Sequence, residues 1–438
     1  MSHEGVYRRL VMRPSAGQLK SLLFSFGVLH TTNTALNILY SLALLLSVSR
    51  ALPQDQYAQV VFLTAIAFYF QPIDQVLGRI SFVELRASVV RNETPKQYVV
   101  VVLGIQIVVL TLASICIPFA TAYGQGSSYQ VSYSFYLLFA LLTNFWAFDL
   151  QSTAFALEMG GKFVRWSLLH RSCQFAVLSA LWLSASFYIF ATLAAAVFTA
   201  FSIFACAALV REIGFRRLPS IQASWRSRVQ LIATSFMSGL ADLLILNVPY
   251  AVVSFTYGVG PTLVVFDSAM KVARLVMAGS RTLAEIGLPR HSRFVVQLDV
   301  RSANRLFSQL VVLCVLASAV PAAVVAIDTP LVFSLLLGPN NIVPAGAARA
   351  ISIIIVATGL YQPASMLMSF TNDYFAIRRF ALVVSSISVL VFGAIAIFKP
   401  DPIRLLWYFA ILLVIAGTVA AVRGRCRERE IEPPNCRT

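Results

Sequence analysis

Charged residues are scarce in this sequence of 438 residues. Asp, Glu, Lys and Arg together make up 12% of it, about half of the roughly 25% usual in soluble domains. The apolar share is 58% and the mean hydropathy is +0.79. This composition excludes a soluble globular protein, which needs more polar surface, and intrinsic disorder, which requires low hydrophobicity. It is typical of a polytopic membrane protein.

Several signatures of catalysis and metal binding are also missing. No G-x-x-x-x-G-K-[ST] motif occurs, so the chain has no P-loop for ATP. The six cysteines show no metal-ligand spacing and no disulfide framework. We find no nucleophile, base and orienting residue that would lie together. We therefore expect no cofactor, no metal site and no enzymatic activity, with a membrane-embedded polysaccharide-assembly enzyme as a weaker alternative.

Long apolar runs account for most of the chain. A helix that crosses about 30 Å of hydrocarbon needs about 20 apolar residues. The runs predict an all-α membrane protein with twelve spans, near 21–48, 57–79, 97–119, 131–157, 167–187, 189–210, 229–256, 262–283, 304–327, 345–368, 379–398 and 403–422. The first run is too long for a cleavable signal peptide, so we interpret it as a retained helix.

The net charge of +16 has a distribution that predicts orientation. Lys and Arg are concentrated in the even-numbered connections and in both tails, and they are rare in the odd-numbered connections. Positive residues favour the cytoplasmic side, so we expect both termini there. A nucleic-acid partner is not expected, because a basic nucleic-acid binder would be far less apolar.

A basic linker near the middle of the chain predicts two halves. We expect an N-terminal six-helix lobe over 1–215, a cytoplasmic linker over 216–228, a C-terminal six-helix lobe over 229–422 and a basic tail over 423–438. Transporters built from repeated halves bind substrate at the interface between them. The sequence therefore predicts two bundles around a central cavity.

Two polar stripes at helical spacing are candidates for the lining of that cavity. They consist of His30, Asn33, Thr34, Asn37 and Ser41 in the first span, and Ser235, Ser238 and Asp242 in the seventh. The alternative interpretation is hydrogen bonding between packed helices, which membrane bundles use widely. His30 is suited either to proton transfer or to a packing role.

Ionisable residues inside the predicted spans form a second set of candidates, because a charge in mid-bilayer normally faces a partner or water. Asp267, Lys271 and Arg274 share one face of the eighth span. Asp267 and Lys271 can pair as i,i+4 neighbours, which leaves Arg274 as a surplus cation. The cluster is interpreted either as a cationic binding site or as a closed ion-pair cluster that locks helices together.

Other intramembrane charges complete the set. Arg349 is a further candidate for the cationic site, unless it extends to the surface. Candidates for proton or sodium coupling are the carboxylates Asp74, Asp149, Asp242 and Asp267. Pro72 precedes Asp74, and the resulting niche holds Gln71 and Gln75, with Arg79 as a possible counter-ion. Pro249 and Pro363 are expected to kink the seventh and tenth spans.

The segment from Leu44 to Arg79 resembles the first loop and second helix of Wzx-type polysaccharide-export flippases. These belong to the multidrug/oligosaccharidyl-lipid/polysaccharide (MOP) exporter superfamily. The matching residues are Arg50, Leu52, Pro53, Asp55 and Tyr57, while Ala58 stands where the family usually has glycine. The link before the tenth span is also similar, with Gly338 and Ala345, and FDSAMKVARL resembles the start of the family's second half.

The resemblance implies a flippase in the bacterial inner membrane that moves undecaprenyl-pyrophosphate-linked oligosaccharides for O-antigen, capsule or exopolysaccharide synthesis. Lys271, Arg274 and Arg349 would then bind the pyrophosphate. His30, Asn33, Asn37 and Ser238 would line the cavity for the sugar. A proton or sodium ion would be a partner, as would a complex of polymerase and glycosyltransferases. The alternatives are a cation-coupled multidrug exporter, a lipid II flippase and a non-transporting scaffold.

Overall fold

The computed structural model confirms the all-α class. It describes residues 16–70, 74, 78, 85, 130–145, 147–157, 159–184, 186–213, 225–296, 299–337, 343–370 and 374–425, and these contain no strand. The helices of the first half are α2 (Ala16–Ala51), α3 (Gln54–Phe68), α6 (Gln130–Phe145), α7 (Ala147–Ala156), α8 (Gly160–Ser184) and α9 (Phe187–Ile213). Those of the second half are α10 (Trp225–Leu246), α11 (Val248–Tyr257), α12 (Pro261–Val296), α13 (Val300–Ile327), α14 (Thr329–Leu337), the 3₁₀ helix η1 (Ala345–Ala347), α15 (Ala348–Phe370), α16 (Tyr374–Phe398) and α17 (Pro402–Arg423).

Seven helices in the described part of the chain are long and apolar enough to cross a membrane. They cover Val28–Ala51, Phe187–Glu212, Gly239–Tyr257, Val300–Ile327, Ala345–Met368, Phe375–Phe398 and Pro402–Arg423. The predicted span at 97–119 and the end of the second span lie outside the described residues. The total of twelve therefore stays a prediction.

Helix ends differ from the predicted spans in three places. The helices α2 and α12 each have 36 residues and extend beyond the runs that predicted them. The predicted fourth span contains α6 and α7, and residue 146 between them lies outside the described residues. The predicted loop at 328–344 contains α14, which the sequence interpretation missed; the carboxylate of Asp328 accepts a hydrogen bond of 3.0 Å from the backbone N–H of Leu331 and so caps this helix.

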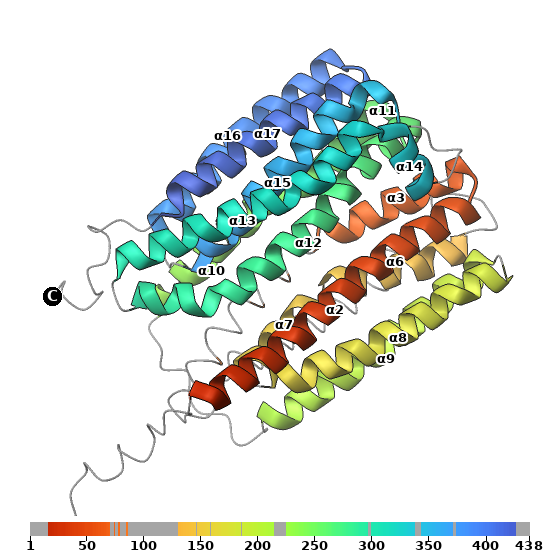
Figure 1. Cartoon of the computed structure of the whole chain (residues 1–438). Helices are drawn as coiled ribbons and strands as arrows, with labels where there is room; N and C mark the ends of the chain where they lie inside the picture. The colour runs from red at the N-terminus through yellow and green to blue at the C-terminus, as the bar shows by residue number, and fades with distance from the viewer. Residues whose placement is uncertain are drawn as a thin grey trace, which may run out of the picture.

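The helices pack as two bundles that lie side by side (Figure 1). In the N-terminal bundle α2 packs on α8, and α3 packs on α6. Both α6 and α8 pack on α9. In the C-terminal bundle α15 packs on α12, α13 and α17, while α10 packs on α16. The bundles meet where α2 and α3 contact α11, α12 and α14, and we call this the inter-bundle interface. The predicted lobe boundary at 216–228 lies partly outside the described residues and stays a prediction.

The centre of the C-terminal bundle is α15. In its apolar window 67% of the residues are buried, against 28% in the windows of α2 and α16. Small residues allow this packing: a Cβ added at Gly359 would lie 2.3 Å from the Ser318 hydroxyl of α13. A Cβ on Gly417 of α17 would lie 3.1 Å from Leu360 of α15. Neighbouring backbones therefore approach α15 on two sides.

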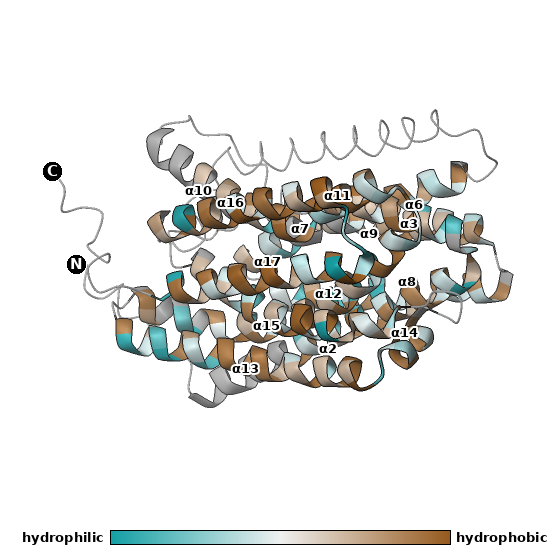
Figure 2. Ribbon diagram, turned by 90° about the horizontal axis from the view of Figure 1, so that it is seen from above, coloured by the Kyte–Doolittle hydropathy of each residue, from teal (hydrophilic) through white to brown (hydrophobic). Residues whose placement is uncertain are grey.

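The outer surface is apolar, as expected for helices in lipid. Large exposed side chains recur at i,i+4 spacing on α13, with Leu316 63%, Val320 67% and Val324 52% exposed. The opposite face of α13 is also apolar, with Phe307 and Val311 buried. Figure 2 shows hydrophobic residues on most of the helix ribbons. A helix that is hydrophobic all round lies in a membrane or a large core.

Two ends of the molecule are distinguished below. The tail end is where α2 begins at Ala16 and α17 ends at Arg423, and the loop end is where α2 ends at Ala51 and α17 begins at Pro402 (Figure 1). From the charge distribution, we expect the tail end to be cytoplasmic.

Candidate functional site

One face of α12 carries the ionic residues that the sequence predicted to lie together. The predicted i,i+4 pair is confirmed: the Lys271 ammonium lies 2.6 Å from Asp267. Tyr250 donates a hydrogen bond of 3.0 Å to the Asp267 carboxylate, and Lys271 donates one of 3.0 Å to the hydroxyl of Tyr57. Because Tyr57 belongs to α3, this last contact crosses the inter-bundle interface. The Lys271 side chain keeps 23% of its surface exposed, whereas Asp267 keeps 1%.

The seventh span is broken at Asn247, as Pro249 led us to expect. Proline has no backbone N–H, so it cannot donate to the preceding turn. The backbone N–H of Tyr250 bonds to the carbonyl of Asn247 at 3.0 Å, rather than to Leu246 four residues earlier. The break therefore leaves the Leu246 carbonyl available to a side chain.

Arg274 occupies that position. Its guanidinium donates to the Leu246 carbonyl at 3.0 Å and to the Asn247 side-chain oxygen at 3.2 Å. It also lies 3.5 Å over the ring of Phe68 on α3, within cation–π distance. The Asn247 amide donates to the Phe68 carbonyl at 2.7 Å. Arg274 is thus held by the broken helix on one side and by the N-terminal bundle on the other.

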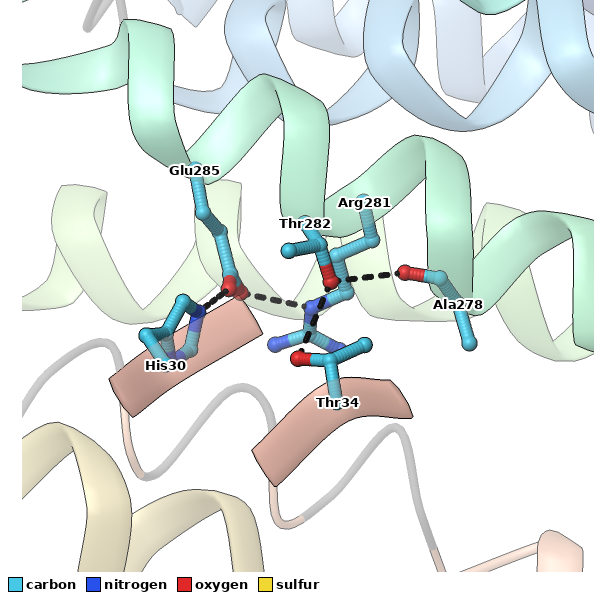
Figure 3. A network of polar contacts seen from close by, with 6 residues as sticks. All are labelled: His30, Thr34, Ala278, Arg281, Thr282 and Glu285. Atoms are coloured by element: carbon cyan, nitrogen blue, oxygen red, sulfur yellow. Dashed lines mark hydrogen bonds and ion pairs between the residues drawn. The ribbon is translucent and has the colours of Figure 1, made fainter. Parts of the chain in front are cut away.

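A second set of contacts crosses the interface nearer the tail end (Figure 3). The ring Nε2 of His30 lies 2.9 Å from the Glu285 carboxylate, whose other oxygen accepts from Arg281 at 2.9 Å. Thr282 donates a hydrogen bond of 3.2 Å to the hydroxyl of Thr34. His30 and Thr34 belong to α2, and the other three residues belong to α12. The bundles are therefore in contact at two depths.

These contacts follow from the helical period. At about 100° per residue, the α12 residues that take part lie within about 100° of one another around the axis; they are Asp267, Lys271, Arg274, Arg281, Thr282 and Glu285. The face has three cations and two carboxylates. It keeps one unit of positive charge in surplus at the interface between the bundles.

The predicted stripe on α2 is divided between two neighbours. His30 and Thr34 contact α12, as described, whereas the side chain of Asn33 accepts a hydrogen bond of 2.9 Å from Ser167 of α8. Asn37 is half-buried, and its backbone carbonyl accepts a bond of 2.8 Å from Ser41. Three members of the stripe thus make hydrogen bonds between helices, and their role as a cavity lining stays a prediction.

Three further predicted charges, Arg349, Asp242 and Asp74, belong to parts of the chain other than α12. Arg349 is the second residue of α15 and is exposed. Asp242 accepts a hydrogen bond from the hydroxyl of Tyr361 within the C-terminal bundle. Asp74 is helical and 1% exposed. The structure brings the predicted Asp267, Lys271 and Arg274 together, with Tyr250 beside both Asp267 and Arg274.

Some predicted residues are described only in part. Asp149 lies in α7 and Ser238 in α10, but their side chains are outside the described part of the structure, as is that of Ser235. Gln71, Gln75 and Arg79, the predicted niche around Asp74, also lie outside it. Their roles stay predictions.

Sequence reasoning missed several polar residues that the structure reveals. Arg281 and Glu285 were overlooked because the predicted span ended at 283, although Glu285 continues the i,i+3/i+4 series from Lys271. Arg171 was overlooked because the predicted fifth span began at 167, whereas α8 begins at Gly160 and places Arg171 near its middle. In the described residues no three His, Cys, Asp or Glu side chains form a group that could hold a metal ion.

Comparison with known proteins gives a structural match only. No protein-family model and no curated protein sequence matches the chain. An inward-facing multidrug resistance MATE family transporter of the MOP superfamily matches with a TM-score of 0.65 and 14% identity, over 92% of this chain and 98% of that chain. An outward-facing conformation of a multidrug resistance MATE family transporter of the MOP superfamily matches with a TM-score of 0.60 and 14% identity, over 93% of this chain and 95% of that chain.

A further match is a MOP superfamily transporter from Pyrococcus furiosus, with a TM-score of 0.59 and 13% identity over 93% of this chain and 95% of that chain. Each match extends over nearly the whole of both chains, so the similarity is one of the overall fold and not of a single segment. The chain has the fold of the MATE transporters of the MOP superfamily.

Proposed function

We propose that this chain is a flippase that moves a lipid-linked oligosaccharide pyrophosphate across the bacterial inner membrane by alternating access. The observation that carries the proposal is the surplus of cations on the interface face of α12. Moving a headgroup with two or more negative charges through hydrocarbon is prohibitive without a polar path. Lys271 and Arg274 supply charged donors for pyrophosphate oxygens at the position where two such bundles separate.

The contacts of Lys271 suggest how substrate could enter the cluster. Its ammonium is partly exposed and is held by one carboxylate and one hydroxyl, from Asp267 and Tyr57. A phosphate oxygen that replaced the Tyr57 hydroxyl would keep the ammonium hydrogen-bonded and would release α3 from α12. Binding of the anion would thereby favour separation of the bundles on that side. Arg349, which is exposed at the loop end, is proposed as a first contact for the pyrophosphate.

The sugar and the coupling ion would use other parts of the bundles. We propose that Asn33, Asn37, His30 and Ser238 provide hydrogen-bonding groups for the oligosaccharide when the bundles are apart. Proton or sodium coupling is proposed for the carboxylates Asp74, Asp149, Asp242 and Asp267. Asp242, which Tyr361 holds by a hydrogen bond, has a partner whose position would change with its protonation state. A polymerase and glycosyltransferases are proposed partners at the membrane.

The alternative proposal is a cation-coupled multidrug exporter, because two of the structural matches are multidrug resistance transporters. An organic cation is attracted by acidic and aromatic groups, and the surplus positive charge on α12 disfavours this substrate. For the Pyrococcus protein, a reversed polarity of the binding pocket is stated to suggest a different function. The charge of the binding region is accordingly the property by which we separate the two proposals.

The deciding experiment is complementation of a flippase-null strain with a Lys271→Ala/Arg274→Ala double variant. We expect surface polysaccharide to fall at least about tenfold, since one charged hydrogen bond contributes about 1.5–3 kcal/mol. The matched control is Lys162→Ala/Arg165→Ala, which removes two exposed cations from α8, with membrane expression measured for both. Full complementation by the α12 double variant would refute the proposed pyrophosphate site. Drug efflux by the wild type without complementation would favour the multidrug exporter.

A further inference from the structure

Arg171 is a cation inside the N-terminal bundle for which the described residues supply no acidic neighbour. Arg171 is half-buried near the middle of α8 and lies beside the ring of Tyr40 on α2, with its guanidinium carbon 6.0 Å from the ring centroid. The ion pairs among the described residues join other side chains. Arg171 therefore has no carboxylate partner within the described part of the chain.

The depth of Arg171 makes this arrangement costly. It is 13 residues from the loop end of α8 at Ser184, about 20 Å at 1.5 Å per residue, and the hydrocarbon is about 30 Å thick. A charge at such a depth normally pairs with another charge or faces water. An arginine side chain keeps its proton in proteins, so Arg171 carries its charge into the bundle. A counter-charge is therefore required at this position.

Several hydrogen-bond donors at and beside Arg171 have no acceptor among the described residues. One terminal nitrogen of the Arg171 guanidinium donates a hydrogen bond of 2.6 Å to the side-chain oxygen of Gln174. The amide nitrogen of Gln174 therefore points away from this bond. That amide nitrogen, the Arg171 Nε and the Tyr40 hydroxyl are all buried, and none has a hydrogen-bond partner among the described residues. Gln174 is 2% exposed and Tyr40 is 4% exposed. Buried polar groups are nearly always satisfied, so three such groups around one cation need an explanation.

We propose that Arg171, Gln174 and Tyr40 form a binding site for an oxyanion between α2 and α8. A phosphate or carboxylate group supplies both the missing negative charge and acceptor oxygens for N–H and O–H donors. The oxyanion is either a free phosphate or the phosphate of a lipid headgroup, and the experiment below separates these two sources. This inference does not rest on the proposed function, because it concerns a different bundle and a different cation.

The test uses the full-length protein in nanodiscs and the variant Arg171→Met, with Arg165→Met on the same helix as the matched control. Thermal unfolding is measured with and without inorganic phosphate in phosphatidylcholine nanodiscs, and in nanodiscs doped with phosphatidic acid. We expect the wild type and the control to be stabilised by one of these anions. The apparent Kd in Arg171→Met should be at least about tenfold weaker, because a charge-assisted hydrogen bond is lost.

The unfolding temperature without anion gives a second readout. Replacing a buried cation that lacks a partner by an apolar side chain of similar length is neutral or stabilising, whereas breaking an ion pair is destabilising. We therefore expect Arg171→Met to unfold at the same temperature as the wild type or a higher one in anion-free nanodiscs. A clear fall would show a carboxylate partner within the chain and would overturn the site. Stabilisation that survives in Arg171→Met, or that neither phosphate nor phosphatidic acid produces in the wild type, would also overturn it.

Discussion

His30 of α2 and Glu285 of α12 are 255 residues apart in sequence and their side chains meet at 2.9 Å. The pair joins the two bundles on the tail-end side, while Lys271 and Tyr57 join them closer to the loop end. The two bundles are thus joined at two depths. The proposed alternating-access cycle would have to break one set of contacts while the other persists.

A disulfide across the tail-end contact should arrest such a cycle. The hydroxyls of Thr34 and Thr282 lie 3.2 Å apart, close enough to test a disulfide, which requires Cβ atoms about 3.5–4.5 Å apart. We expect Thr34→Cys/Thr282→Cys to crosslink under oxidation, to lose transport, and to regain it on reduction. Electrophoretic mobility and a transport assay measure the two effects. The single-cysteine variants serve as controls, and undiminished transport by the crosslinked protein would show that these helices do not separate.

The Asp267–Lys271 pair provides a test of its two interpretations. Asp267→Asn should lower stability by about 3–5 kcal/mol, because it leaves Lys271 without its counter-charge. Asp267→Asn/Lys271→Met should recover most of this loss, since the uncompensated charge is gone. If the lysine binds substrate, the double variant is stable but inactive. Recovery of both unfolding temperature and transport would instead assign the pair a purely structural role.

Close packing around α15 predicts a steric effect at Gly359. A methyl group there would lie 2.3 Å from the Ser318 hydroxyl and 3.0 Å from the Cys314 carbonyl. We expect Gly359→Ala to destabilise the protein by about 1–3 kcal/mol, as overpacking does. Gly393→Ala on α16 is the matched control, because nothing lies within 4 Å of its added Cβ. Equal unfolding temperatures for the two variants would contradict the close approach of α13 and α15.

A pH effect is expected at the start of α13. The Asp299 carboxylate accepts a hydrogen bond of 3.0 Å from the backbone N–H of Ser302, and hydrogen bonding by Ser302 lowers the pKa of Asp299 below its usual value. A carboxylate whose pKa is lower in the folded state stabilises it above the unfolded pKa, near 4, and this stabilisation is lost as pH falls through the folded pKa. Asp299→Ala should therefore unfold at a lower temperature than the wild type at pH 7. The difference should shrink as the pH falls below 4, and a difference independent of pH would exclude the cap.

The sequence predicted those features that depend on one helix alone. The spacing of Asp267 and Lys271 was enough to predict their ion pair, and Pro249 was enough to predict a break in the seventh span. Glu285 and Arg171 were missed for a different reason. Charge dilutes the apolar run near each of them, so the predicted eighth span ended too early and the predicted fifth span began too late. The partners Tyr57, Phe68 and His30 belong to other helices, and a single sequence does not say which helices pack together.

The break at Asn247 has a consequence for motion. Because Arg274 completes the hydrogen bonding of the Leu246 carbonyl, the end of α10 is tied to a side chain of α12 rather than to its own next turn. Bending at this joint therefore requires Arg274 to move with it. The same guanidinium lies on Phe68 of α3. A change of the angle between α10 and α11 would therefore also alter this contact between the two bundles. We therefore expect the contacts of Arg274 to limit bending between α10 and α11 at Asn247.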